Sequence, residues 1–421
     1  MPNGAATAHL YEPKLAAVLR EGYSLDMLRR DAVAGLTVAI VALPLSMAIA
    51  VASGVSPDRG LYTAIVGGFV VSALGGSRYQ VGGPAGAFIT LVAATTAEIG
   101  LDGLALTVLV SGVLLTAIGL MGLGRFIRLI PHAVTVGFTG GIAVTIAASQ
   151  IKDLFGLKLA HEPGPLLPKL AALAAAASTV SLAALALGAG CAALIFGIRR
   201  FRPNWPGMLI AVVTASGAAL AFGLPVDTIG LRFGGIPNGL PAPHLPAFSM
   251  ALLWAALPPA LSFTLLGGVE SLLSAKVADG MTGRAHRSNM ELVAQGLANV
   301  AAAFFGGIAV TGAIARTATN VRAGACSPVA GMLHSAFLLA FMLVAGSLAS
   351  YVPLSALAGV LIVVCWNMAE KREFATLLRQ PGPAAVLLAT FGLTIVKDLT
   401  FGILGGCGLA LALWLGSRRR A

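Results

Sequence analysis

The chain has 421 residues, of which 57% are hydrophobic and only 10% are charged, whereas soluble domains carry roughly 25% charged residues. This composition excludes an ordinary soluble domain and predicts an all-α polytopic membrane protein. The net charge of +11 does not indicate nucleic-acid binding, because the basic residues are strung out between apolar runs and form no patch with interleaved aromatic residues.

Residues 1–30 mix charges with a short amphipathic pattern and are predicted to be a cytosolic lead-in, not a cleavable signal. Apolar runs then recur to the end of the chain. The periodicity and the breakers predict fourteen membrane spans, near residues 32–51, 60–75, 84–97, 102–121, 129–148, 170–197, 206–222, 250–277, 289–304, 312–321, 327–347, 352–367, 383–396 and 399–416.

Two of these spans, 84–97 and 312–321, are too short to cross a bilayer. At 1.5 Å per residue, roughly 10 to 14 residues cover about half of the hydrocarbon core. The distribution of Arg and Lys between the spans places both termini in the cytosol, which requires an even number of spans. The predicted location is therefore the inner (plasma) membrane, with the lipid bilayer as a partner.

The two halves of the chain have the pattern of an internal duplication. "SALGGSRYQVGGPAGAFITLV" and "AAFFGGIAVTGAIARTATNV" share a Gly-Gly, a short β-prone piece and a half-length helix, and two further pairs of segments match at nearly the same offset of about 222 to 230 residues. With seven spans in each half, the second repeat must be inverted in the membrane relative to the first. The predicted units are a first repeat at 31–222, an extracytoplasmic Pro-rich loop at 223–249 and a second repeat at 250–417.

The two half helices are expected to meet near the midplane with their N-termini directed at one spot. Unpaired backbone N–H groups, and about half a positive charge from each helix dipole, favour an anion there. Pro84 suits a first helical position, because it lacks an N–H that would be unpaired anyway. The residues expected to let a ligand reach the backbone are Gly82, Gly83, Ala85, Gly86, Ala87, Gly312, Ala313, Ile314 and Ala315.

Arg316 lies one turn into the second half helix and is predicted to add a cation to this anion site. The alternative is that its side chain snorkels to the lipid headgroups. Arg322 follows in the same segment and is better placed for that role.

Glu270 lies in the middle of the eighth span, and carboxylates inside spans usually mark ion or proton pathways. A structural alternative is a salt bridge to Lys276 or Arg316. Lys276 lies about 240° around the helix from Glu270, so these two side chains do not face each other. A pair of Glu270 with Arg316 would itself be functional. Ser274, one turn on, adds an oxygen on the same face and could complete a site for a hard cation. Coupling to a proton or to sodium is the resulting hypothesis.

No catalytic constellation is present, so the chain is not predicted to be an enzyme, and no cofactor is expected. His286 stands among basic residues without a nucleophile pattern, phosphate-binding loop or metal spacing. His132, Asp31, Glu162 and Glu291 are expected at membrane interfaces. Four residues in apolar runs are expected to be core packing residues with neither a disulfide nor zinc: Cys191, Cys326, Cys365 and Cys407.

These segments resemble the SulP/SLC26 family of anion transporters. The resemblance rests on "DAVAGLTVAIVALPLSMAIA", "GGPAGA", "ESLLSAKVADGMTGRAHRSNMELVAQGLAN" and "FGGIAVTGAIARTATNVRAGA", and it covers the chain from about residue 20. It implies a core domain of spans one to four and eight to eleven (about 31–121 and 250–347) and a gate domain of spans five to seven and twelve to fourteen (about 125–222 and 352–417). It also implies elevator-like movement of the core against the gate.

The resemblance implies substrate contacts at Leu45, Ile49, Ala85, Ile314, Ala315 and Arg316. Glu270 and Ser274 match an Asp and a Thr that bind sodium in the bicarbonate-transporting branch. Leu45 and Ala315 stand where the family has polar residues, so contacts to the anion would fall to the backbone and Arg316. Family members usually continue into a cytosolic STAS domain, whereas this chain ends at "GSRRRA", which implies a truncated chain or a protein without that module.

The predicted function is secondary transport of a small anion, such as sulfate, bicarbonate or a C4-dicarboxylate, driven by a proton or sodium. One alternative is an uncoupled anion channel or exchanger in which Glu270 is a structural charge. Another is a nucleobase permease of the same fold, which Arg316 disfavours because a neutral base gains little from a buried cation. The oligomeric state is open, with a homodimer as one option.

Overall fold

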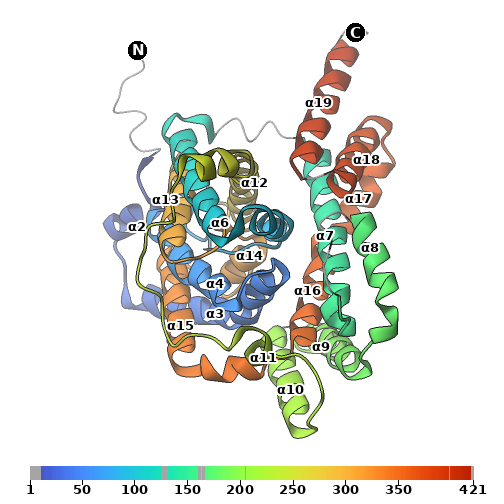
Figure 1. Ribbon diagram of the computed structural model, residues 1–421. Helices are drawn as coiled ribbons and strands as arrows, with labels where there is room; N and C mark the ends of the chain where they lie inside the picture. The colour runs from blue at the N-terminus through green and yellow to red at the C-terminus, as the bar shows by residue number, and fades with distance from the viewer. Residues whose placement is uncertain are drawn as a thin grey trace.

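The computed structural model describes residues 11–124, 131–159, 163, 166–203, 205–397 and 399–418. Apart from two strands of two residues each, its regular elements are helices, so the predicted all-α class is confirmed for these residues. Figure 1 shows the helices in two groups that lie side by side.

The first group combines the beginning of the chain with the first part of its second half. In it, α6 packs against α12 and α13, and α15 packs against α3. Its elements are α2 (Lys14–Glu21), α3 (Leu25–Ala52), α4 (Pro57–Tyr62), η2 (Thr63–Gly67), α5 (Gly68–Leu74), β1 (Gly82–Gly83), η3 (Gly86–Phe88), α6 (Ile89–Leu120), α12 (Met250–Thr282), α13 (Ser288–Phe304), β2 (Thr311–Gly312), α14 (Ile314–Arg322), α15 (Val329–Ala345) and η6 (Ser347–Tyr351).

The second group likewise draws on both halves of the chain. In it, α16 packs against α7 and α9, and α18 packs against α7 and α19. Its elements are α7 (His132–Phe155), α8 (Leu166–Ala175), η5 (Ala177–Thr179), α9 (Leu182–Phe201), α10 (Gly207–Ala221), α16 (Leu354–Met368), α17 (Lys371–Leu378), α18 (Pro381–Val396) and α19 (Leu399–Arg418). The short helix α11 (Ile229–Phe233) lies in the connection between the two halves and contacts η6.

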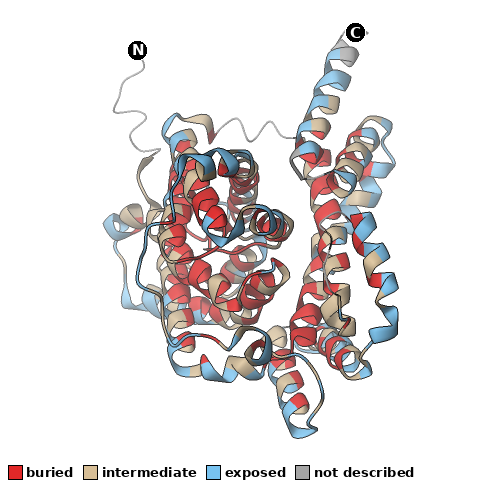
Figure 2. Ribbon diagram, viewed as in Figure 1, coloured by how far each residue is buried: buried red, intermediate tan, exposed pale blue. Residues whose placement is uncertain are grey.

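Among the described residues, six helices are long and apolar enough to cross a membrane, and five shorter apolar helices accompany them. Large apolar side chains stay exposed on outer faces, among them Phe201, Leu220 and Trp254. Figure 2 shows buried residues concentrated inside each group and exposed ones on the outside. Water would disfavour such apolar outer faces, whereas lipid solvates them.

The structure corrects one of the predicted spans. The span expected at 170–197 is divided: α8 ends at Ala175 and α9 begins at Leu182, where the Ser181 hydroxyl accepts a hydrogen bond from Ala184 N–H and caps the new helix. The break expected between the spans at 84–97 and 102–121 is present inside α6, at Gly100, whose φ of 72° and ψ of −175° are not helical. Glycine adopts this backbone conformation without the steric penalty of a Cβ.

Two residues from each half of the chain form a small antiparallel ladder. Gly82 of β1 pairs with Gly312 of β2, and Gly83 pairs with Thr311. The short β pieces expected from the sequence are therefore paired with each other across about 230 residues of chain. The helices that follow β1 and β2 consequently begin near each other, from opposite ends of this two-residue ladder.

Candidate functional site

The β1–β2 ladder positions the starts of two helices. After β1 the chain turns into η3 at Gly86, and after β2 it turns into α14 at Ile314. No side chain caps either start. Backbone N–H groups in the first turn of a helix have no partner within that helix, and their partial positive charge favours an anion.

Arg316 projects from α14 towards β1 and α3. Its side chain is almost fully buried, with 2% exposed. Nη1 donates to the Gly82 carbonyl (3.3 Å), and Nη2 donates to the Pro84 carbonyl (3.3 Å) and to the Ser46 hydroxyl (3.0 Å). The cation from the second half of the chain is thus held by backbone carbonyls of the first half.

The Arg316 guanidinium retains donors and lacks a carboxylate partner. A guanidinium has five N–H groups, and three of them are used in the contacts above, while Nε is buried without a hydrogen-bond partner. Among the described residues, Arg316 forms no ion pair. A buried charge without a counter-ion is unfavourable unless something neutralises it.

Glu270 is a second ionisable residue with a buried atom that lacks a hydrogen-bond partner. The residue is partly buried in α12, and its Oε2 atom is buried without a hydrogen-bond partner. Neither the salt bridge to Lys276, which the helix geometry disfavours, nor the one to Arg316 is present among the described residues. The carboxylate is therefore free to take up a proton or to help bind a cation.

Ser274, the oxygen expected beside Glu270, is fully buried and belongs to a chain of hydroxyl groups. Its hydroxyl donates to Thr317 Oγ1 (3.0 Å), which in turn accepts from Val81 N–H (3.3 Å). One turn earlier, Ser271 Oγ lies 2.9 Å from Thr311 Oγ1. This chain fixes α12 to β2, α14 and the segment before β1. Ser274 Oγ keeps acceptor capacity that a hard cation could use.

The other residues predicted to contact substrate differ in their exposure. Leu45, Ile49, Ala85 and Ala87 are buried, whereas Gly86 is partly buried and Ile314 and Ala315 are exposed at the start of α14. A Cβ added at Gly86 would lie 3.4 Å from Met368 Sδ and 3.6 Å from Ile146 Cδ1. Hence η3 faces helices α16 and α7 of the second helix group.

Sequence reasoning missed Ser46, although it follows Leu45 directly. Ser46 is completely buried, donates to the Ala42 carbonyl (2.7 Å) and accepts from Arg316. A serine inside an apolar helix usually bonds the carbonyl four residues back, so its second partner could not be inferred from α3 alone. Thr317 was missed for a similar reason, because its partners lie on other elements.

Two of the residues expected at membrane interfaces are fully buried inside the protein. Asp31 accepts hydrogen bonds from Tyr23 (2.9 Å), from the backbone of Cys326 (2.7 Å) and from Ser327. Glu291 accepts from Ser77 N–H (3.0 Å) and from Gln295 (3.1 Å). Polar groups that are satisfied in this way can be buried. Exposed His132 pairs with Glu373 at 3.5 Å, and Glu162 lies outside the described residues.

Comparison with known proteins gives consistent matches. The model of the "Sulfate permease family" matches residues 28–390. "Putative sulfate transporter YvdB" of Bacillus subtilis is 41% identical over 94% of this chain and 75% of its own length. "Bicarbonate transporter BicA" of Picosynechococcus is 30% identical over 91% of this chain and 69% of its own length.

Solved structures share the fold. The transmembrane domain of a cyanobacterial bicarbonate transporter BicA has a TM-score of 0.83 and 29% identity, covering 90% of this chain and 98% of that one. Murine Slc26a9, an anion transporter solved in an inward-facing state, has a TM-score of 0.87 at 19% identity and covers 99% of this chain and 73% of that one. At this lower identity the likeness concerns the fold alone.

Proposed function

Because this chain belongs to the sulfate permease family of membrane transporters, we propose that it is a secondary active transporter of a small anion. One observation carries the proposal. Arg316 is a buried cation that forms no ion pair within the described residues, and it lies where two uncapped helix starts converge. A bound anion supplies the missing negative charge.

The anion is held mainly by the backbone and Arg316. The exposed start of α14 at Ile314 and Ala315, together with Gly86, leaves the helix starts approachable. Leu45, Ile49, Ala85 and Ala87 supply apolar walls that exclude water, which strengthens an electrostatic contact. A compact oxyanion such as sulfate or bicarbonate, or one carboxylate of a C4-dicarboxylate, suits such a site. Relatives named as sulfate and bicarbonate transporters support the first two choices.

Glu270 couples transport to a proton or to sodium, with Ser274 as a second oxygen for sodium. Its Oε2 atom is buried without a hydrogen-bond partner. A negative charge in that position is unfavourable unless a proton or a bound cation neutralises it. Neutralising Glu270 also removes a repulsion from the nearby anion site. In the alternative of an uncoupled channel or exchanger, Glu270 would only shape the local field.

The proposed architecture is a fourteen-span, seven-plus-seven inverted repeat in the inner membrane with both termini in the cytosol. The first helix group would be the core, spanning about 31–121 and 250–347, and the second the gate, spanning about 125–222 and 352–417. The contacts within each group support this division. Elevator-like movement of the core against the gate would carry the site across the membrane, in a monomer or a homodimer.

Uptake into proteoliposomes tests the proposed function. Labelled sulfate, bicarbonate, fumarate and uracil should be offered separately, each with an imposed proton gradient and then with an imposed sodium gradient. We expect accumulation of at least one of the anions and none of uracil. Uptake of uracil alone would instead favour a nucleobase permease, and anion flux that never exceeds equilibration would favour the uncoupled channel or exchanger.

A further inference from the structure

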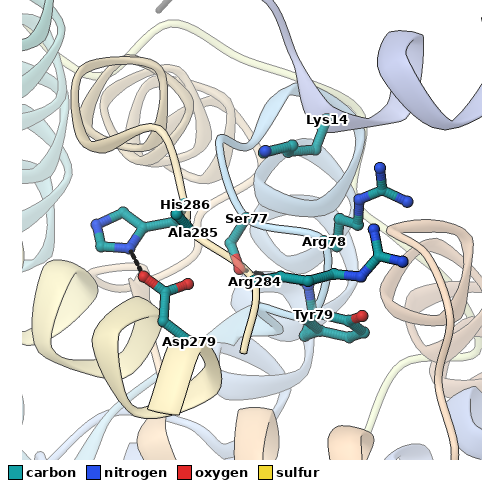
Figure 3. Close-up of a pocket in the computed structure, with 8 residues that line it drawn as sticks. All are labelled: Lys14, Ser77, Arg78, Tyr79, Asp279, Arg284, Ala285 and His286. Atoms are coloured by element: carbon teal, nitrogen blue, oxygen red, sulfur yellow. Dashed lines mark hydrogen bonds and ion pairs between the residues drawn. The ribbon is translucent and has the colours of Figure 1, made fainter. Parts of the chain in front are cut away.

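A basic pocket of about 290 Å³ lies in the first helix group and shares no lining residue with the anion site at Arg316. Three segments that are distant in sequence meet there: the N-terminal end of α2, the turn between α5 and β1, and the loop between α12 and α13. Figure 3 shows the pocket. The lining residues that matter for its chemistry are Lys14, Ser77, Arg78, Asp279, Arg284 and His286.

The walls of this basic pocket are tied together by main-chain hydrogen bonds. Lys14 N–H donates to the Gly75 carbonyl (2.9 Å), and Arg287 N–H donates to the Gly76 carbonyl (2.9 Å). A Cβ at Gly76 would lie 2.1 Å from the Arg287 carbonyl oxygen, so only glycine allows this approach. The pocket is consequently built into the fold and does not depend on a single loop.

The cations of the pocket are only partly neutralised. Arg78 pairs with Glu21, whereas the side chains of Lys14 and Arg284 form no hydrogen bond or ion pair with the part of the chain that the structure describes. The Glu21 carboxyl has a lowered pKa, chiefly through its hydrogen bond with Arg78, and the charges of Arg284 and Lys14 lower it further. All three cations therefore act on one carboxylate.

The remaining titratable groups of the pocket are already paired with each other. His286 Nδ1 lies 2.6 Å from Asp279 Oδ2, and its Nε2 lies 3.0 Å from the Ser288 hydroxyl. In Figure 3 this His286–Asp279 pair lies apart from the arginine and lysine side chains. The pKa of Lys14 is lowered, first by burial and then by the charges of Arg287 and Arg78, while the charges of Asp279 and Glu21 act in the opposite direction. Three cations line the pocket beside one carboxylate, so an excess of positive charge faces it.

We propose that this basic pocket binds a phosphate-bearing anion through Arg284, Lys14 and Arg78. Arginine forks match phosphate oxygens in a bidentate manner, and lysine adds a compact charge. The shared chemistry is the phosphate group, which either a soluble phosphate or the headgroup of an anionic phospholipid can present. This site goes beyond the proposed transport function, because it does not require the phosphate to be transported.

Occupancy of the pocket bears on the transport site through two short connections. Residues 77–79 lead directly into β1, whose Gly82 carbonyl accepts from Arg316. Arg284 follows the C-terminal end of α12, the helix that carries Glu270 and Ser274. A phosphate bridging Arg78 and Arg284 would fix the segment before β1 relative to the end of α12. It should therefore change the rate of anion uptake from the side of the membrane on which the chain termini lie.

The test is phosphate binding by the full-length purified protein, measured through the thermal unfolding midpoint. Inorganic phosphate and short-chain phosphatidylglycerol are titrated separately, with phosphatidylcholine as the neutral lipid. An Arg316→Ala background keeps phosphate from binding at the transport site. We expect a saturable rise in the midpoint, with half-saturation at about tenfold higher ligand concentration in Arg284→Gln and a further loss when Lys14→Gln is added. Arg372→Gln, which removes an exposed charge from α17 in the second helix group, is the matched control and should bind as the parent does.

The two ligands separate the sources of phosphate. A response to inorganic phosphate alone identifies a soluble ligand, and a response to phosphatidylglycerol alone identifies a lipid headgroup; both support the site. No response to either ligand, or an equal loss in Arg372→Gln, overturns it. If a variant fails to fold, hydrogen exchange of the wild-type chain decides, since phosphate should protect residues 75–79 and 283–287, and unchanged exchange there contradicts the proposal. None of these results depends on transport activity.

Discussion

Arg316 and Glu270 share an unusual property at the scale of single residues: each bears a charged group inside a helix group, and each has a buried polar atom without a hydrogen-bond partner. Structural ion pairs in membranes neutralise such charges locally. Here the described residues supply no opposite charge to either one. Two uncompensated charges of opposite sign fit the proposed transport, in which an anion would neutralise Arg316 and a proton or sodium would neutralise Glu270.

We predict that Arg316→Ala reduces anion uptake more than about tenfold while the protein remains folded, because a charge-assisted contact is lost. Arg316→Lys should restore part of the activity, since it keeps the charge but loses the planar fork. Uptake by reconstituted protein measures both, with size-exclusion chromatography to verify folding. Wild-type rates in Arg316→Ala would show that the anion binds elsewhere.

Ser46→Ala should raise the KM for anion uptake several-fold, because Arg316 Nη2 loses an acceptor at 3.0 Å and the guanidinium becomes less fixed. Ser53→Ala, at the C-cap of the same helix, is the matched control: Ser53 is also fully buried, and its hydroxyl donates to the Ile49 carbonyl (2.7 Å). The KM of Ser53→Ala should stay near the wild-type value. Equal effects of the two variants would mean that Ser46 acts only through the stability of α3.

At the scale of elements, apolar runs and breakers in the sequence indicated most helices, because a bilayer requires long apolar segments with internally satisfied backbones. The break before α9 was missed, since the apolar run at 170–197 masks the capping role of Ser181. The charges in apolar runs, Arg316 and Glu270, could be picked out without a structure. The partners of Ser46 and Thr317 could not, because they lie on elements far away in sequence.

Asn299 belongs to a polar pattern that is visible in the sequence of α13. Its amide donates to the Val310 carbonyl and accepts from Val310 N–H, both at 2.9 Å, so the side chain imitates a neighbouring strand just before β2. Glu291, Gln295 and Asn299 recur every four residues and therefore share one face of α13. A polar stripe on an apolar helix predicts that this face forms hydrogen bonds with backbone groups, but it does not identify the segment that supplies them.

The β1–β2 ladder makes Gly83 sensitive to the smallest substitution. A Cβ at Gly83 would lie 1.6 Å from Arg316 Nη1, so Gly83→Ala must displace the guanidinium. We predict loss of uptake comparable to that of Arg316→Ala, although the arginine is still present. In α9, Gly190→Ala meets no atom within 4 Å and serves as the control. Uptake and unfolding midpoints should be measured together, and normal uptake in Gly83→Ala would contradict the described position of Arg316.

At the scale of the whole molecule, Glu270 separates concentrative transport from passive flux. Glu270→Gln imitates the neutral carboxyl permanently, so it should still exchange anion but lose accumulation driven by a proton or sodium gradient. In the wild type, accumulation should rise as the outside pH falls or as outside sodium rises, and the two gradients imposed separately identify the ion. Accumulation by Glu270→Gln equal to the wild type would exclude the coupling role.

The pairing of β1 with β2 has a consequence for how the chain is made. Ribosomes deliver β1 roughly 230 residues before its partner, and contacts of such large sequence separation form late in folding. Until Arg316 emerges, the carbonyls of Gly82 and Pro84 lack the guanidinium that they bind afterwards. The first half of the newly synthesised chain therefore cannot form the transport site alone. The site is completed only after the second half has been synthesised.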